Sequence, residues 1–183
     1  MKKYFVLASL LFSLNSYALV GLGGYVPFGL STRDSADGGV STFAFDPALT
    51  LNHVMPFFLG QLFMPEIGHV FHGEGKDGHS KKTIFGLLDF GYQIQTGLVL
   101  RYGLGTFLTK ISGDGGAVEL NNGTSTKTFY RPSKSVTSWN TTLNGGIEWA
   151  FNSNYASRFE LFMFDFLAST RKFSYILNIT YYL

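Results

Sequence analysis

The chain has 183 residues, no cysteine and a formal net charge of +2 at neutral pH. Without cysteine, an exported chain has no disulfide framework, and the near balance of charge argues against the basic face that nucleic-acid binding requires. Aromatic residues make up 17% of the chain and charged residues only 14%, against about 25% charged residues in typical soluble proteins. This composition is unlike that of an ordinary soluble domain and suits the wall of a β-barrel.

The beginning of the chain has the order of a secretory signal peptide. Two lysines follow the initiator methionine, an apolar run extends from residue 4 to residue 14, and Ser16 and Ala18 are the small residues that a signal peptidase requires. The apolar run is too short to span a bilayer as a helix. We therefore predict cleavage after Ala18, which leaves one mature domain at 19–183. Removing the two lysines leaves 12 basic and 12 acidic side chains, so the mature domain is neutral.

The mature domain contains eight segments in which apolar and polar residues alternate, the pattern of a two-faced β-strand. In chain order they are Leu19–Phe28, Ser41–Val54, Leu59–His72, Thr83–Ile94, Gly97–Ile111, Val136–Phe151, Ala156–Ala168 and Phe173–Leu183. No other stretch approaches 18 consecutive apolar residues, which excludes helical membrane spans after processing. An even number of strands can close into a barrel without an unpaired edge. The pattern predicts an all-β fold, an eight-stranded antiparallel transmembrane up-and-down β-barrel.

Two of these segments interrupt the pattern. Pro65 lies inside the third segment, and proline cannot donate to a strand ladder, so we expect a bulge there. In the seventh segment the alternation continues until Asp165, which falls among the apolar positions. We expect either a bulge near Asp165 or a place for this residue at the membrane interface.

The direction of the two faces follows from their composition. The polar faces consist mostly of glycine, serine, threonine and asparagine, which suits a filled lumen better than a water-exposed exterior. Trp139 and Trp149 share one face and lie ten residues apart, roughly 25 Å along the membrane normal at a tilt of about 40°. Together with Tyr181 they are candidates for the aromatic girdles. The opposite arrangement, a soluble barrel with an apolar lumen, is the least favoured alternative.

The connections alternate in length. With the N-terminus in the periplasm, the outward connections run through 29–40, 73–82, 112–135 and 169–172. The inward connections run through 55–58, 95–96 and 152–155. The inward turns are short and uncharged, and three of the four outward loops are longer and charged, as in outer-membrane barrels.

Seven charged side chains fall on the predicted inward face. They are Asp46, Glu66, Asp89, Arg101, Glu148, Arg158 and Glu160. Because buried charges are costly unless they are paired, we expect a network of ion pairs that fills the barrel. The alternative is a gated path for protons or small ions, which the excess of carboxylates would make cation-preferring.

The longest outward connection contains a hairpin signal, Asn122-Gly123, between Ala117–Leu120 and Thr124–Tyr130. Basic and aromatic residues meet near the end of this ribbon. They are Lys127, Phe129, Tyr130 and Arg131. This group could bind lipopolysaccharide phosphates, a surface glycan or another protein, or the ribbon could simply pack over the mouth of the barrel.

Enzymatic and metal-binding sites are weakly supported. His69 and His72 are three residues apart in a strand, so they face opposite sides and cannot converge on one metal ion. His79-Ser80 follows a glycine-rich loop, which is a poor platform for an activated nucleophile. We therefore predict no catalytic residue, no metal and no cofactor.

The signal peptide, the eight two-faced strands and the short inner turns resemble the small outer-membrane barrels of Gram-negative bacteria, which include the OmpA transmembrane domain, OmpX and OmpW-like proteins. The last strand, which alternates up to Tyr181 and Leu183, resembles the signal read by the barrel-assembly machinery, although that signal usually ends in phenylalanine. The resemblance implies an integral protein in contact with outer-membrane lipid and lipopolysaccharide, with periplasmic termini and a structural or surface-interaction role. The alternatives are a narrow OmpW-like pore for small hydrophobic solutes and a lipid A-modifying enzyme.

Overall fold

The computed structural model describes residues 17–26, 32–34, 41–43, 45–73, 80–121, 125–130, 133–167 and 172–183. Most of the predicted signal peptide lies outside these residues. The first strand begins at Tyr17, two residues before the predicted first residue of the mature domain, Leu19. Cleavage after Ala18 therefore stays a prediction.

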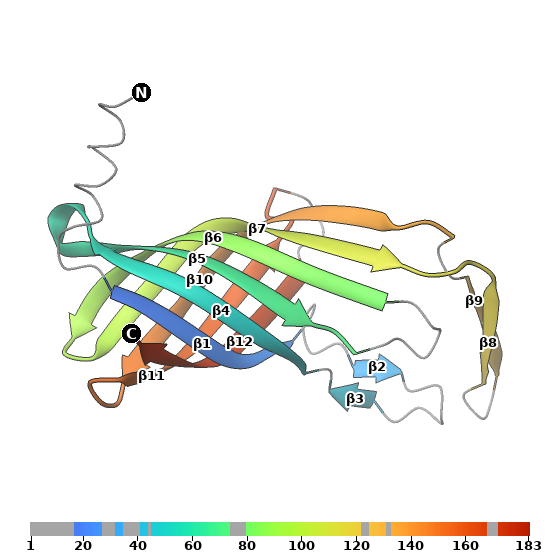
Figure 1. Cartoon of the computed structure of the whole chain (residues 1–183), viewed down its shortest axis with the longest axis horizontal. Helices are drawn as coiled ribbons and strands as arrows, with labels where there is room; N and C mark the ends of the chain where they lie inside the picture. Colours follow the sequence, from blue (N-terminus) through green and yellow to red (C-terminus); the bar gives the residue numbers. More distant parts are fainter. Residues whose placement is uncertain are drawn as a thin grey trace.

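Eight antiparallel strands close into one barrel in the order β1-β12-β11-β10-β7-β6-β5-β4 (Figure 1). Their bounds are β1 (Tyr17–Val26), β4 (Asp46–Pro56), β5 (Gln61–Phe71), β6 (Ser80–Gln95), β7 (Leu98–Ser112), β10 (Val136–Ala150), β11 (Tyr155–Phe164) and β12 (Lys172–Tyr182). Each barrel strand pairs with the next one along the chain, and pairing of β1 with β12 closes the ring. The predicted eight-stranded up-and-down barrel is confirmed.

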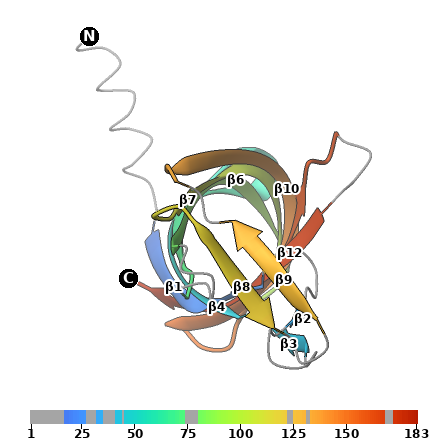
Figure 2. The same ribbon diagram turned by 90° about the vertical axis from the view of Figure 1, so that its right-hand side faces the viewer.

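Five short elements lie outside the barrel wall. They are β2 (Thr32–Asp34), β3 (Ser41–Phe43), η1 (Phe58–Gly60), β8 (Ala117–Asn121) and β9 (Thr126–Tyr130). The β8–β9 pair is the hairpin predicted around Asn122-Gly123, and it forms its own two-stranded sheet. In Figure 2 this hairpin lies across one end of the barrel. No helix among the described residues is long and apolar enough to cross a membrane.

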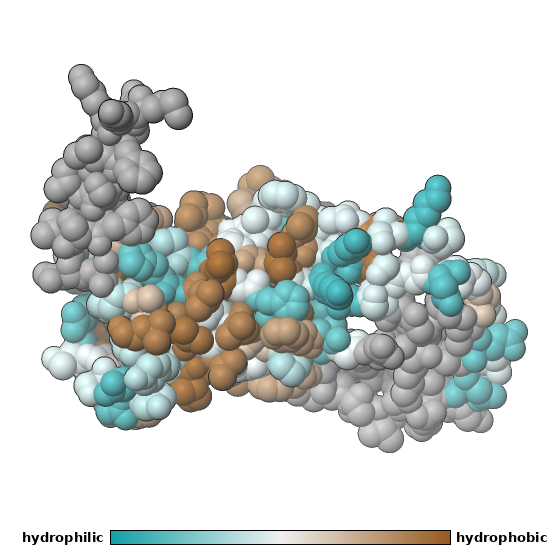
Figure 3. Space-filling view, in the orientation of Figure 1, coloured by the Kyte–Doolittle hydropathy of each residue, from teal (hydrophilic) through white to brown (hydrophobic). Residues whose placement is uncertain are grey.

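The alternation in sequence becomes an alternation in burial. In β12, Ser174 and Asn178 are buried in the lumen, whereas Leu177 and Ile179 are exposed on the outer surface. The other barrel strands follow the same rule over most of their length, because successive side chains of a strand point to opposite faces; the exceptions are the end of β1, where Gly24, Tyr25 and Val26 are all buried, and the exposed start of β10. Figure 3 shows the result, in which hydrophobic side chains cover the middle of the visible wall.

The bulge expected at Pro65 is absent. β5 pairs with β6 without a shift, and its register with β4 is the same at Asn52↔Glu66 and at Met55↔Phe63, on either side of the proline. Proline removes a ladder hydrogen bond, but its backbone fits an extended strand, so no extra residue is inserted. The irregularity in this part of the wall is instead a register shift between β6 and β7 at Ile94, beside their tight turn.

Asp165 does not lie within a strand. β11 ends at Phe164, earlier than predicted, and Asp165 begins the following turn with a φ of 52°. Aspartate adopts this left-handed conformation more readily than most residues do. Of the two alternatives expected here, the bulge is absent because β11 ends before Asp165, and a place for this residue at the membrane interface stays a prediction.

Candidate functional site

The central layer of the lumen is a cluster of six charged side chains, none more than 3% exposed. They come from five neighbouring strands, β5, β6, β7, β10 and β11, and each occupies an inward position of its strand. They are Glu66, Asp89, Arg101, Glu148, Arg158 and Glu160. Six of the seven predicted inward charges therefore meet in one place.

Arg101 organises one side of this central cluster. Its guanidinium donates hydrogen bonds to Asp89 (2.8 Å), Glu148 (2.9 Å) and Glu66 (3.1 Å). A planar guanidinium with several donors in fixed directions can bind three carboxylates at once, which a lysine ammonium would do less well. Arg101 therefore ties β5, β6 and β10 to its own strand, β7.

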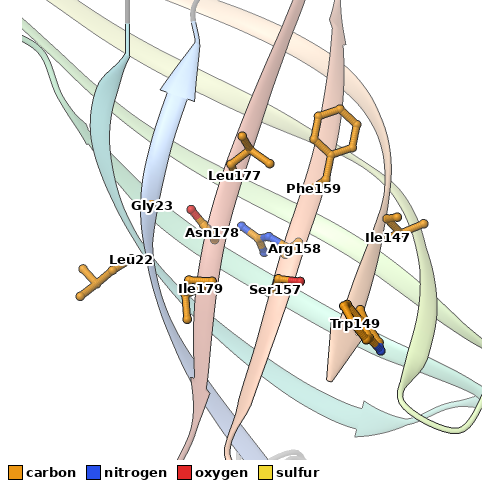
Figure 4. Close-up of a pocket in the computed structure, with 10 residues that line it drawn as sticks. All are labelled: Leu22, Gly23, Ile147, Trp149, Ser157, Arg158, Phe159, Leu177, Asn178 and Ile179. Atoms are coloured by element: carbon orange, nitrogen blue, oxygen red, sulfur yellow. The ribbon is translucent and has the colours of Figure 1, made fainter. Parts of the chain in front are cut away.

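Arg158 organises the opposite side. It binds Glu66 through both of its terminal nitrogens, and the contact between Nη2 and Oε1 is 2.8 Å long. With the amide of Asn178 turned so that its oxygen faces the guanidinium, Arg158 also donates to that oxygen (2.8 Å). In Figure 4 Arg158 and Asn178 point into the lumen, whereas Phe159, Leu177 and other apolar neighbours point away from it. Glu66 is thus shared by both arginines, which makes it the centre of the cluster.

Neutral side chains complete the network. Asn144 donates to Asp89 (2.7 Å) and to Glu160, and Asn52 donates to Glu66 (3.3 Å). The hydroxyl of Tyr182 donates to Glu148 at 3.1 Å. Four carboxyl groups thus share two arginines and several neutral donors. Since buried charges are tolerated when they are paired and hydrogen-bonded, this arrangement suits a fixed plug.

Asp46 lies apart from the central cluster, near the end of the barrel with the long connections. It contacts Nδ1 of His72 at 2.6 Å, and Nε2 of His72 contacts the hydroxyl of Thr83 at 2.7 Å. Thr83 in turn contacts Thr109 at 3.0 Å. A carboxylate–imidazole–hydroxyl chain can activate a nucleophile, but Thr83 is only 3% exposed, which leaves a substrate little access to it. The chain acts instead as a polar clamp across β4, β5, β6 and β7.

His69, by contrast, contacts Phe71 with a distance of 4.3 Å between ring centroids. The two neighbouring histidines therefore have different partners. Among the described residues, no group of three or more histidine, aspartate or glutamate side chains could hold a metal ion.

An aromatic plug fills the lumen between the central cluster and the end of the barrel with the long connections. Its rings come from Tyr25, Phe85, Phe107, Phe162 and Phe164. Phe107 is the hub, with ring centroids 4.8 Å from Phe85, 4.9 Å from Phe164 and 5.2 Å from Phe162. This plug was not predicted from the sequence, because the inward faces were taken to be polar along their whole length. The available signal was phenylalanine at inward positions near the long connections.

The opposite end of the lumen has a smaller apolar cluster. Leu19, Val54 and Met64 are buried together there. The interior is therefore filled in three layers, aromatic, charged and aliphatic, from the end with the long connections to the other.

The remaining predicted site residues lie on the outside. Trp139 is 69% exposed, Trp149 56% and Tyr181 39%. In the β8–β9 hairpin Tyr130 is exposed. Lys127 and Phe129 belong to β9, but their side chains lie outside the described part of the structure, as does the whole of Arg131. The structure therefore brings together the lumen charges, whereas the arrangement of the predicted hairpin group stays a prediction.

Comparison with solved structures identifies proteins that share the fold of this chain. Ail, the attachment invasion locus protein of Yersinia pestis, solved with the heparin analogue sucrose octasulfate, aligns over 92% of this chain and 97% of its own at 11% identity, with a TM-score of 0.53. The chain shares the fold of Ail. Neisserial surface protein A aligns over 92% and 96% at 14% identity and a TM-score of 0.49. The N-terminal β-barrel domain of Pseudomonas aeruginosa OprF aligns over 92% and 98% at 12% identity and a TM-score of 0.44.

The resemblance to small eight-stranded outer-membrane barrels is thus confirmed at the level of the fold. No protein-family model and no curated protein matches the chain.

Proposed function

We propose that the protein is an integral β-barrel of a Gram-negative outer membrane, with an occluded lumen and a structural or surface-interaction role. One observation carries this proposal: the polarity of the barrel is inverted. Arg101 and Arg158 are 1% exposed inside it, whereas Leu22, Ile67 and Trp139 on the outer surface are 65%, 63% and 69% exposed.

Hydrocarbon is the environment that suits such a surface. Exposed apolar area costs roughly 25 cal/mol per Å² in water, and soluble monomers seldom carry apolar patches larger than a few hundred Å². A closed barrel also pairs every strand edge, which a bilayer requires because it offers the backbone no hydrogen bonds.

The two ends of the barrel support an orientation. At one end the connections are short, such as the turn at Thr96-Gly97 and the bends at 151–154. At the other end the connections contain the β2–β3 and β8–β9 hairpins. We assign the first end, with both chain termini, to the periplasm and the second to the cell surface. In this proposal the barrel-assembly machinery is the partner during biogenesis.

The filled lumen supports a barrel that does not conduct. Eight strands leave an interior that side chains can fill, and three packed layers do so here. We expect no stepwise current when the purified protein is added to a planar bilayer. Reproducible single-channel steps would favour the alternative, a narrow OmpW-like pore.

The surface role would lie with the β8–β9 hairpin. Tyr130, at the end of the hairpin, is 82% exposed. Lys127 and Arg131, the basic residues of the predicted binding group, lie close to Tyr130 in the sequence. Because Ail was solved with sucrose octasulfate, a sulfated glycan is a suitable first probe. We expect Tyr130→Ala to weaken retention on a heparin column, with the exposed Tyr155→Ala, at the other end of the barrel, as its matched control.

The absence of catalysis is part of the proposal, since the Asp46–His72–Thr83 chain is closed to substrate. Expression of the protein in a Gram-negative host should leave the mass of its lipid A unchanged. A new lipid A species that Thr83→Val abolishes would establish the enzymatic alternative.

The deciding experiment is gel mobility of the outer-membrane fraction with and without boiling. A closed barrel resists detergent until it is heated, so the unboiled band should migrate differently from the boiled one. A variant that lacks residues 1–18 is the control, and it should stay in the cytoplasm. Recovery of the full-length protein in the soluble periplasm, with no shift, would refute the membrane location.

A further inference from the structure

The outer surface of the barrel carries two opposed lysines near the end with the long connections. Lys82 of β6 is the direct cross-strand partner of Lys110 of β7, and both are exposed. Phe71 of β5 and Thr137 of β10 flank them in the same row. Like charges in this position destabilise a strand pair. Within the described part of the chain neither lysine has an ion pair that offsets this repulsion, so an external anion would stabilise the pair.

The outward side chains change from charged to apolar directly below these lysines. The next outward row contains Ile84, Leu108 and Trp139, and Trp139 is largely exposed. Cations above an amphipathic aromatic residue, with apolar side chains below, match the order of layers from headgroup to hydrocarbon. The two lysines therefore lie at the level of lipid headgroups in the proposed membrane orientation.

Two hollows lie in the same wall, one at this level and one further into the apolar band. One, of about 240 Å³, lies beside the lysines and is lined by His69, Ser80 and Lys82 among others. The other is a groove of about 650 Å³ lined by residues that include Ile67, Gly86, Leu88 and Thr106. Gly86 is four residues from Lys82 along β6, which corresponds to about 13 Å. A hollow with Lys82 at its edge and an apolar groove are thus spaced along one strand.

Gly86 has no backbone reason to be glycine. A Cβ added there would meet only the backbone oxygen of Glu66, at 3.9 Å, and its φ is not positive. The missing side chain keeps the apolar groove open.

We propose that this wall is a docking site for lipid A, the phosphorylated and acylated glycolipid of the outer leaflet. A phosphate group bridges Lys82 and Lys110, and an acyl chain lies in the groove over Gly86. A phosphate monoester carries about −1.5 to −2 charges, which matches two lysines better than the single charge of a glycerophospholipid. This inference rests on the proposed outer-membrane location.

The test measures lipid binding to the detergent-solubilised full-length protein by mass spectrometry of the intact complex. The probes are lipid A, lipid A with its phosphates removed, and phosphatidylglycerol. Wild type should bind lipid A most tightly, and Lys82→Ser/Lys110→Ser should weaken that binding roughly thirtyfold, because each of the two lysines near a lipid surface contributes about 1 kcal/mol. The same double variant should leave binding of the dephosphorylated form unchanged. Lys134→Ser, which removes an exposed lysine outside this row, is the matched control.

A second variant tests the groove. Gly86→Leu should fill it and weaken binding of phosphorylated and dephosphorylated lipid A by the same factor. Equal binding of lipid A by wild type and the lysine double variant, or no preference for lipid A over phosphatidylglycerol, would overturn the docking site.

Gel mobility of the same preparations separates the two proposals. A heat-dependent shift in the membrane fraction together with unselective lipid binding would refute only the docking site. Absence of the protein from the membrane fraction would refute the proposed function.

Discussion

The middle of the lumen and its outer third are built from inward faces of the same strands, yet they fill space in different ways. In the middle, Arg101 and Arg158 neutralise carboxylates through directional hydrogen bonds. In the outer third, Phe107 packs against three other phenylalanine rings and needs shape complementarity but no charge partner. Loss of one partner from an ion-pair cluster leaves a buried charge unpaired and strongly destabilises the fold. An apolar plug instead loses stability in proportion to the volume removed. The following predictions test this difference.

The largest effect is expected for Arg101→Met. The substitution leaves Glu66, Asp89 and Glu148 with less compensating charge in a dry interior, so the free energy of unfolding should fall by about 3–5 kcal/mol. Urea unfolding in lipid vesicles, followed by the fluorescence of the two tryptophans, measures this change. Lys134→Met on the surface is the control and should stay within about 0.5 kcal/mol. A loss below about 1 kcal/mol for Arg101→Met would show that the carboxyl groups are not charged in the folded barrel.

A somewhat smaller effect is expected for Phe107→Ala, about 3 kcal/mol, because it opens a cavity at the hub of the aromatic plug. The charged layer below stays intact, so planar-bilayer recordings should still show no current. Phe107→Leu keeps most of the volume and should restore most of the stability. Channel steps in Phe107→Ala alone would identify the aromatic plug, rather than the charged cluster, as the layer that closes the lumen.

The polar clamp of Asp46, His72 and Thr83 should contribute less to the free energy of unfolding than either layer of the lumen. His72→Ala removes two hydrogen bonds, to Asp46 and Thr83, and should lower the free energy of unfolding by about 1–2 kcal/mol. His69→Ala is the matched control, since its ring contacts Phe71 rather than this chain of polar groups. Equal losses for the two histidine variants would mean that the clamp adds nothing beyond ordinary packing.

The smallest change in the free energy of unfolding is expected for a surface substitution, and it should be a gain rather than a loss. In vesicles without lipid A, Lys82→Ser relieves repulsion with Lys110 and should raise the free energy of unfolding by about 0.5 kcal/mol. High salt should abolish the gain because it screens exposed charges. A salt-independent loss of stability would instead indicate that the Lys82 side chain stabilises the wall by packing.

The alternation of residue types is enough to predict the barrel wall. A period of two fixes which face each residue occupies, so the inward direction of Glu66, Asp89 and Arg158 follows from the sequence. The outward direction of Trp139 and Trp149 follows in the same way.

Contacts across the lumen could not be predicted. The contact between Asp46 and His72 was not predicted either, although it is local: the register of the adjacent strands β4 and β5, with Ala48↔Val70, puts the two residues side by side, and that register was not read from the sequence. The aromatic plug was missed although Phe85 and Phe162 interrupt the polar pattern of their own strands, because which inward rings meet depends on how the strands are arranged around the lumen. Pro65 shows a further limit: the sequence marks a lost ladder hydrogen bond but does not tell whether the register shifts as well.

The pairing of β1 with β12 has a consequence for how the protein is made. β1 is the first barrel strand in chain order and β12 the last, and their eight paired positions run from Leu19↔Tyr182 to Val26↔Tyr175. Until β12 arrives, β1 keeps an unsatisfied edge that can pair with any other extended chain. Closure therefore depends on delivery of the last strand, and a ribosome that stalls before residue 172 would release a chain prone to aggregate rather than a smaller barrel.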